Sequence, residues 1–304
     1  MQPEITLAIP VYNSAEKLKV TLLSLSEFLG DERVEVLVSD NDSSDHTECL
    51  ISEFSRSQYN LNYIKLSQNV GYGGNVKNCL ERSLGAWVWL ISSGDRLVLE
   101  DSVDSFLNRL RSIQGPSALV QSKVVSTEGS GILDGRIGLY DPKLSGNVFR
   151  GNLVRDPGLL SKIEFDDWCH VRVALKLIGR ELKAPDFLPL VSFEIKRSER
   201  AWWNANNLIF FRVCLELDKI QRNSAGLFEK LGRQLPSTKT RWLVIGRAYF
   251  YARSCSRKTD PEEWIKLRRV LPPFGYYTIR VITLIIPYVL AAIIYSIGRR
   301  VARV

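Results

Sequence analysis

The sequence predicts an α/β protein with a doubly wound, mostly parallel sheet, helices on both faces, and a helical C-terminal appendage. In the first half, short apolar runs alternate with helical patterns, which is typical of parallel sheets covered on both faces. The 304 residues are 45% hydrophobic and 24% charged, which excludes a disordered or fibrous chain. Residues 1–195 carry 20 Lys and Arg against 26 Asp and Glu, a net −6, whereas residues 196–304 carry 21 against 7, a net +14. We therefore expect a body at 1–197 and an appendage at 198–304 with different partners.

Each predicted strand of the body precedes a predicted helix. Strands are expected at residues 5–10, 34–39, 61–66, 87–92 and 118–125. Helices are expected at residues 13–28, from 45 onward, at 75–83, 101–111 and 166–178, and in the appendage at 202–223, 240–254 and 262–270. Asn13 with Glu16, and Asp45 with Glu48, have the spacing of capping residues. The glycine-rich residues 126–160 are expected to be irregular, as segments that carry substrate sites often are.

The five cysteines are widely spaced, and no two have Cys-x-x-Cys spacing. This pattern excludes a zinc knuckle or dithiol site and favours reduced cysteines in the cytosol. The N-terminus leads directly into the first apolar run, so we expect no secretory signal.

The loops after the first four strands carry the candidate ligand-binding residues. They are Pro10, Tyr12 and Asn13; Asp40; Asn69 and Gly71; and Ser93 and Asp95. Ligands of doubly wound sheets bind beyond the carboxyl ends of the strands, so these loops are expected to share one crevice. An aromatic ring can stack on a nucleobase, and a carboxylate can accept a hydrogen bond from a nucleobase N–H or a ribose hydroxyl. Glycine lets backbone N–H groups approach phosphate oxygens. The sequence therefore predicts a nucleotide site.

In their order, these motifs resemble those of the inverting nucleotide-sugar glycosyltransferases of family two, which have the GT-A fold. The matching stretches are Ile-Pro-Val-Tyr-Asn at 9–13, Asp-Asn-Asp-Ser-Ser-Asp at 40–45 and Asn-Val-Gly-Tyr at 69–72. The resemblance covers roughly residues 3–195. It implies that Pro10 and Tyr12 border the base and that Asp40 contacts it, while Asn13, Asn69, Gly71 and Ser93 complete the nucleotide site. For Asp40 the alternative is a turn-forming residue.

Asp95 matches the last residue of the family's Asp-x-Asp motif, which contacts the metal and the diphosphate. The first Asp of that motif is Ser93 here, and the middle residue is Gly94. The resemblance implies Mg²⁺ or Mn²⁺ at Asp95, and the missing carboxylate is expected to lower metal affinity. It also leaves open a non-catalytic relative that only binds nucleotide sugars.

Two further stretches resemble the acceptor-binding part of this family. They are Gly-Asn-Val-Phe-Arg at 146–150 and Glu-Phe-Asp-Asp-Trp at 164–168. In the family a Glu-Asp pair opens a helix, and its Asp is the general base. Asp167 matches the base, and Asp166 stands where the family has Glu. The alternative is that both are helix N-terminal charges. His170 is a candidate contact of the diphosphate or the acceptor. Arg200 is a candidate contact of the leaving diphosphate, with a solvated or membrane-facing charge as the alternative.

The basic appendage contains an uncharged apolar stretch at residues 281–298, flanked by Arg280 and Arg299. Eighteen residues with an internal Pro287 are marginal for a spanning helix, so interfacial, spanning and buried arrangements stay open. Aromatic residues interleaved with Lys and Arg are typical of helices on anionic membrane surfaces, and no nucleic-acid motif is present.

Taken together, the sequence predicts a metal-dependent hexosyl or deoxyhexosyl transferase of cell-surface polysaccharide synthesis, membrane-associated at the cytoplasmic face. Its partners would be a nucleotide-diphospho-sugar donor, a glycan or lipid-linked glycan acceptor and the membrane; nucleic acid is not expected, and a homo-oligomer is compatible with the sequence. The nearest rival is a polyprenyl-phosphate glycosyltransferase.

Overall fold

The computed structural model describes residues 2–55, 60–126, 129–132, 143–166, 168–181, 183 and 185–196. Within these residues, no helix is both long enough and apolar enough to cross a membrane. The predicted appendage, with its apolar stretch 281–298 and Arg200, lies outside them, and so does Asp167.

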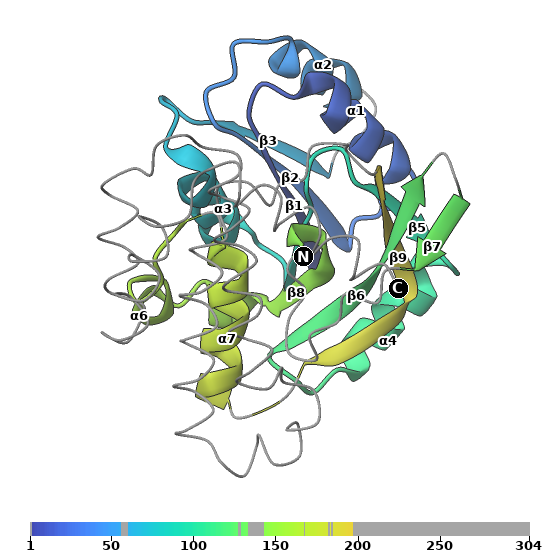
Figure 1. The fold of residues 1–304 in the computed structure, drawn as a ribbon, viewed down its shortest axis with the longest axis vertical. Coiled ribbons are helices and arrows are strands. Elements are labelled where there is room, and N and C mark those ends of the chain that lie inside the picture. The colour runs from blue at the N-terminus through green and yellow to red at the C-terminus, as the bar shows by residue number, and fades with distance from the viewer. Residues whose placement is uncertain are drawn as a thin grey trace, which may run out of the picture. The chain divides into compact units, whose positions relative to one another are not determined.

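One sheet forms the centre of the described body (Figure 1). Its strands are β1 Ile5–Val11, β2 Val34–Asp40, β3 Leu61–Lys65, β4 Trp87–Leu90, β5 Arg96–Leu99, β6 Ser117–Ser126, β7 Gly129–Ile132, β8 Asn147–Arg150 and β9 Asp186–Lys196. Their order is β3-β2-β1-β4-β8-β6-β9-β5, with β7 paired to β6. As predicted, β1 to β4 pair in parallel. Beyond β4 the pairings are antiparallel except between β6 and β9, so the predicted parallel order holds for the N-terminal half.

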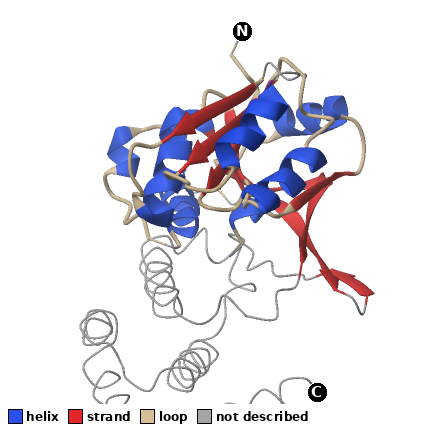
Figure 2. Cartoon of the chain, turned by 90° about the horizontal axis from the view of Figure 1, so that it is seen from above, coloured by secondary structure: helices blue, strands red, loops and turns tan. Residues whose placement is uncertain are grey.

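Helices cover both faces of the sheet, as Figure 2 shows from above. They are α1 Ala15–Ser24, α2 Thr47–Ser55, α3 Gly71–Arg82, α4 Val103–Ser112, α5 Gly151–Val154, α6 Pro157–Leu160 and α7 Cys169–Glu181, with a 3-10 turn, η1, at Leu144–Gly146. Every residue of β1 and β2 is buried, because both faces are covered. Alternate β1 residues, such as Leu7 and Ile9, join the core formed with α1, α2 and α4. The opposite face packs against α3.

Three predicted elements differ from the structure. The first helix ends at Ser24, not at Phe28. The Ser24 hydroxyl donates to the Thr21 carbonyl (2.6 Å) and accepts from Leu97 N (3.0 Å), and the chain then tightens into turns. Helix α3 begins at Gly71 rather than Asn75. Within 126–160, residues 144–160 form η1, β8, α5 and α6 instead of an irregular segment. Strands β5 and β9 were not predicted.

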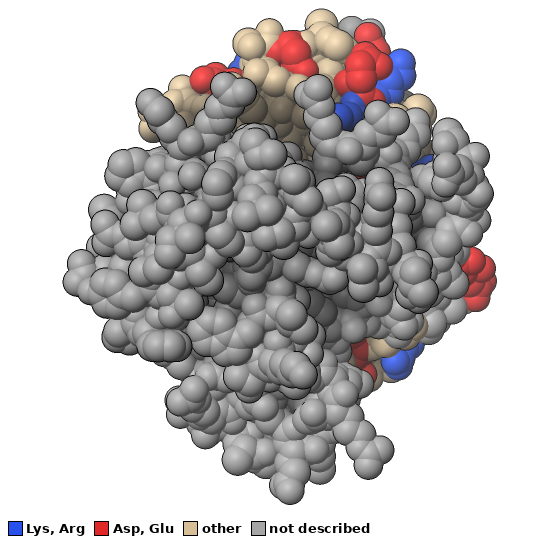
Figure 3. All heavy atoms as spheres, in the orientation of Figure 1, with Lys and Arg blue, Asp and Glu red and all other residues tan. Residues whose placement is uncertain are grey.

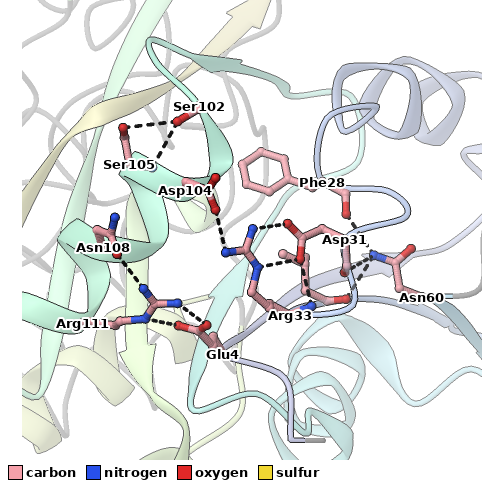
Figure 4. A network of polar contacts seen from close by, with 11 residues as sticks. Glu4, Phe28, Asp31, Arg33, Asn60, Ser102, Asp104, Ser105, Asn108 and Arg111 are labelled. Atoms are coloured by element: carbon pink, nitrogen blue, oxygen red, sulfur yellow. Dashed lines mark hydrogen bonds and ion pairs between the residues drawn. The ribbon is translucent and has the colours of Figure 1, made fainter.

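A polar network ties together the end of the sheet opposite the candidate site (Figure 4). The Arg33 guanidinium lies between Asp31 (2.6 Å) and Asp104 (2.6 Å), and Arg111 pairs with Glu4 at 2.5 Å. The hydrogen bond from Arg33 holds the pKa of Asp31 below its usual value. These contacts join the loop before β2 to α4, so the network is structural.

Charged side chains of both signs lie next to each other on the described surface near α1 and α2, at the top of Figure 3. The ion pairs of this region include His46 with Glu16 (2.9 Å) and Lys65 with Glu48 (2.8 Å). His46 is exposed. Exposed pairs of this kind contribute little to stability, so this surface gives no argument for a site.

Candidate active site

The parallel register brings the predicted strand-end motifs to one edge of the sheet. Val11, the last residue of β1, lies opposite Asp40, the last of β2. Asn41 N donates to the Val11 carbonyl (2.9 Å), and Ile91 N donates to the Ala8 carbonyl (2.8 Å). The loops that follow β1, β2 and β4 therefore start side by side, as the sequence predicted.

The first two loops hold each other through Asn13. Its backbone N–H donates to the Ser43 hydroxyl (2.9 Å), and its side-chain oxygen accepts from Ser44 N (2.8 Å). Asn13 has a φ of 45°, a left-handed conformation that Asn tolerates better than most residues. The expected capping role of Asn13 for α1 is therefore wrong, because its side chain binds the second loop. Tyr12 remains 48% exposed at the end of β1, while Pro10 is buried within that strand.

Asp45 caps two helices at once. One carboxylate oxygen accepts from Ala15 N at the start of α1 (3.0 Å), and the other accepts from Thr47 N (3.1 Å) and the Thr47 hydroxyl (2.5 Å) at the start of α2. Burial by itself would raise the pKa of Asp45, but these hydrogen bonds outweigh it and leave the pKa below its usual value. The sequence predicted the cap of the second helix, whereas the cap of the first helix comes from a residue thirty positions away.

Replacing Asp45 with Asn is expected to lower the free energy of unfolding by about 1 kcal/mol at pH 7, because both N-termini lose a charged acceptor. The folded pKa lies below the unfolded value of about 3.9, so the stabilisation is present above that pH and is lost as the pH falls further. Urea unfolding at pH 7 and pH 3 measures the difference, which should shrink at pH 3. The neighbouring exposed Asp42→Asn variant is the control; equal stability of the two variants at pH 7 would contradict the capping role.

Asp40 is fully buried, and both of its oxygens accept hydrogen bonds. Ser43 N donates to Oδ1 (2.9 Å), and the Tyr63 hydroxyl from β3 donates to Oδ2 (2.6 Å). Burial, and then the hydrogen bond to Asp40, raise the pKa of Tyr63 well above its usual value. These contacts match the turn-forming alternative for Asp40. A contact between Asp40 and the nucleobase stays a prediction. Such a contact requires Ser43 or Tyr63 to move away from the carboxylate.

Asn41 and Asn75 organise the third loop, and neither role was predicted. Asn41 accepts from Val70 N (2.9 Å) and donates to the Asn69 side chain (2.9 Å), which in turn accepts from Gly71 N (2.8 Å). Buried Asn75 donates to the carbonyls of Val11 (3.2 Å) and Ser39 (3.0 Å), and so fixes α3 to both strand ends. Asn69 and Gly71 thus lie at the predicted edge, with the Gly71 N–H already used within the loop.

The turn at residues 92–95 follows β4 and carries the expected metal ligand. Gly94 has a φ of 99°, so a glycine suits the middle of this turn. Gly94 N donates to the Thr21 hydroxyl (2.9 Å), which donates to the Asp95 carbonyl (2.9 Å). Ser145 of η1 donates to Asp95 Oδ2 (2.6 Å). Thr21 and Ser145 were not predicted, because nothing in the sequence links them to a turn more than forty residues away.

Asp166 caps α7 and pairs with a buried arginine. Its Oδ1 accepts from Trp168 N (2.9 Å), and its Oδ2 lies 2.9 Å from Nη2 of Arg172, whose side chain is 2% exposed. These contacts match the helix-terminal alternative for Asp166. His170 is buried and its ring stacks on that of Trp168 at 6.2 Å, so its contact with a diphosphate or acceptor stays a prediction.

Helix α3 touches the segment before α7 at Gly73. A Cβ placed on Gly73 would lie 1.9 Å from the Phe165 carbonyl oxygen and 2.9 Å from Asp166 N. Only glycine permits this approach, because both neighbouring atoms belong to the backbone. The contact brings the third loop of the predicted donor side against the segment that leads to the predicted base.

Among the described residues, no three His, Cys, Asp or Glu side chains form a metal-binding group. Asp95 is the single carboxylate on its turn. One carboxylate is nevertheless compatible with Mg²⁺ or Mn²⁺ where substrate phosphates supply further oxygen ligands. The residues therefore fit a metal that is held jointly by Asp95 and a bound diphosphate.

Comparison with known proteins agrees with the predicted family. The sequence model of glycosyl transferase family 2 matches residues 6–129, a range that contains all four strand-end motifs. Residues 6–129 are therefore similar to a glycosyl transferase family 2 domain. A curated relative, the uncharacterized glycosyltransferase YfnE of Bacillus subtilis (strain 168), is 33% identical over 95 residues, which are 31% of this chain and 24% of the relative. The match therefore spans about a quarter of that relative's length.

Solved structures share the fold at low identity. TarS 1–349 of S. aureus in complex with UDP-GlcNAc has a TM-score of 0.55 at 14% identity, covering 98% of this chain and 92% of that one. Longer TarS has a TM-score of 0.51 at 16% identity, covering 91% of this chain and 49% of that one. The mannosyltransferase PcManGT from Pyrobaculum calidifontis, in complex with GDP-Man and Mn2+, has a TM-score of 0.51 at 14% identity, with coverages of 97% and 87%. At these identities the likeness shows the fold, which is the GT-A α/β fold.

Proposed function

We propose that the chain is an inverting glycosyltransferase that moves a hexosyl or deoxyhexosyl group from a nucleotide-diphosphate donor to a hydroxyl of a glycan acceptor. The observation that carries the proposal is the convergence of the strand-end motifs of the family 2 domain at one edge of the sheet, interlocked through Asn13 and Asn41. Structures of the same fold that hold UDP-GlcNAc, or GDP-Man with Mn2+, support a nucleotide-sugar donor.

On the donor side, Tyr12 offers an exposed ring on which the base stacks. Asp95 would hold a divalent cation together with the diphosphate. When bound, that cation neutralises charge on the nucleoside diphosphate that leaves. The N-terminus of α3 faces the same edge, and its backbone N–H groups and dipole favour a negatively charged ligand.

On the acceptor side, Asp167 takes the proton of the attacking hydroxyl. The acceptor oxygen forms a bond to the anomeric carbon as the bond from that carbon to the diphosphate oxygen breaks, so the configuration inverts. A carboxylate within hydrogen-bond reach of the hydroxyl can supply such general-base catalysis. The contacts of Asp166 support this division of roles, since its carboxylate is already engaged by Trp168 N and by Arg172.

The acceptor is proposed to be lipid-linked, at the cytoplasmic face of the membrane. The support comes from residues 196–304, whose net charge of +14 surrounds the uncharged stretch 281–298. Basic residues there would bind anionic lipid, while the acidic body would hold the substrates. A homo-oligomer is compatible with this arrangement.

Titration calorimetry with UDP and GDP, and with their sugar conjugates, tests the donor assignment. At least one nucleotide should bind more tightly with Mn²⁺ than without it, and Asp95→Asn should remove that increment, because Asp95 is the proposed protein ligand. The loss should be about tenfold or more in Kd, the scale of one charge-assisted contact. Asp104→Asn, at the opposite end of the sheet, is the control and should bind as the wild type does.

Absence of binding by every nucleotide would overturn the transferase proposal. Binding without donor turnover under any metal would favour the non-catalytic relative, whose motivation is Ser93 in place of the first carboxylate. Transfer to polyprenyl phosphate instead of a glycan hydroxyl would favour the rival transferase.

A further inference from the structure

We propose that Ser145 is a positioning residue that orients the Asp95 carboxylate for the donor's diphosphate and metal; the proposal rests on the proposed function. Ser145 lies in η1, directly before β8, and is fully buried. It is separated from Asp95 by fifty positions and belongs to the segment between the donor motifs and the proposed base. No sequence motif pointed to it.

The hydrogen bonds of Ser145 determine the direction in which its hydroxyl points. Ser92 N donates to Ser145 Oγ (2.9 Å), so the oxygen acts as acceptor there. The hydroxyl proton is therefore available for Asp95 Oδ2 at 2.6 Å, a distance typical of a charge-assisted O–H···O⁻ bond. Ser145 thus joins the two ends of the turn at 92–95. Its own carbonyl accepts from Trp89 Nε1 (2.7 Å), which holds η1 against the buried strand β4.

Thr21 makes the matching connection on the other side of the turn. Its hydroxyl accepts from Gly94 N and donates to the Asp95 carbonyl, each at 2.9 Å. Thr21 therefore fixes the main chain of residue 95, whereas Ser145 fixes its side chain. Each hydroxyl accepts from a backbone N–H and donates to Asp95, but Thr21 donates to the carbonyl whereas Ser145 donates to the carboxylate that is proposed to bind the metal.

A positioning residue is needed because Ser93 stands where the family's motif has its first carboxylate. The turn has one carboxylate, so a cation shared with the diphosphate would depend on the orientation of Asp95 alone. Removing a hydrogen-bond partner that orients a metal-binding carboxylate typically lowers metal affinity by 10- to 100-fold. Ser145 supplies such a contact and, because it precedes β8, also links the metal ligand to the acceptor half of the sheet.

The test is a double-mutant cycle read by calorimetry, not by turnover. Wild type, Ser145→Ala, Asp95→Asn and the double variant are titrated with UDP and with GDP, in the presence and absence of Mn²⁺. Ser145→Ala is expected to weaken Mn²⁺-dependent binding about tenfold and to leave metal-free binding unchanged. The double variant should bind as Asp95→Asn alone, since Ser145 acts through Asp95. Ser145→Cys, with a weaker donor of similar size, should fall between wild type and Ser145→Ala.

Ser117→Ala is the matched control, because Ser117 in β6 is also a buried serine, and its hydroxyl has no hydrogen-bond partner within the described part of the chain. It should bind as the wild type does. Wild-type binding by Ser145→Ala, or effects that add in the double variant, would overturn the role of Ser145 while leaving the proposed function intact. If Asp95→Asn itself keeps full Mn²⁺-dependent binding, the donor assignment fails instead.

Discussion

Replacing Asp167 with Asn is expected to lower kcat by about 10²–10⁴-fold while the protein stays folded. The amide cannot take the proton of the acceptor hydroxyl, and that range is the usual contribution of a general base. Donor binding, measured by calorimetry, should remain that of the wild type, because the base acts on the acceptor. Single-turnover transfer with a saturating donor measures the chemical step directly.

Asp166→Asn is the neighbouring comparison and should act on stability instead. Removing the negative charge of an ion pair whose arginine is 2% exposed weakens the compensation of the buried Arg172 charge, at a cost of about 3 kcal/mol. Urea unfolding measures this loss, and the folded fraction should keep most of its kcat. Intact turnover in Asp167→Asn together with lost turnover in a stable Asp166→Asn would reverse the assignment of the base. Intact turnover in both would favour a phosphate acceptor, which needs no strong base.

Replacing Gly73 with Ala is expected to lower the free energy of unfolding by about 3 kcal/mol, the upper part of the usual cost of overpacking. The new Cβ would lie 1.9 Å from the Phe165 carbonyl oxygen, and neither backbone can yield without moving a helix or the segment before α7. Because this segment leads to the proposed base, kcat should fall as well. Urea unfolding and hydrogen exchange at residues 163–169 measure the two effects.

Gly74→Ala, one residue along the same helix, is the matched control. Its Cβ would lie 2.8 Å from Val70 Cγ2 and 3.0 Å from Val70 Cβ. Val70 is 46% exposed, so rotation of its side chain removes the first contact, and a shift of a few tenths of an ångström in Val70 relieves the second. Alanine also favours the helix by about 1 kcal/mol relative to glycine, so the variant should be close to neutral. If Gly73→Ala unfolds at the same urea concentration as Gly74→Ala, the close contact between α3 and Phe165 does not constrain the fold.

The parallel half of the sheet was predictable because its signals are local. Each of the strands β1 to β4 is a short apolar run followed within a few residues by a turn or cap, and Asp45 with Glu48 marks the start of α2 without reference to any other segment. Once those strands are parallel, their carboxyl ends must lie at one edge. The position of Tyr12, Asp40, Asn69 and Asp95 at that edge followed from the order of the motifs.

The later strands were less predictable because their stability depends on distant partners. β5 has four residues and pairs with β9, so Val98 lies opposite Ser192. Neither sequence contains a turn signal that points to the other, and the register between β6 and β9 shifts between Val120 and Gln121. The antiparallel additions to the sheet therefore had no counterpart in the local pattern.

The sequence by itself determined the parallel half of the sheet, the similarity of residues 6–129 to glycosyl transferase family 2 and the edge that carries the candidate site. Only the tertiary structure decided what the individual side chains do there: Asp40 accepts from Tyr63, Asp166 from Arg172, and Asp95 from Ser145. The physical reason is that periodicity and capping report interactions within a few residues. The direction of a carboxylate, by contrast, is set by whichever donors the packing of distant elements brings within hydrogen-bond distance.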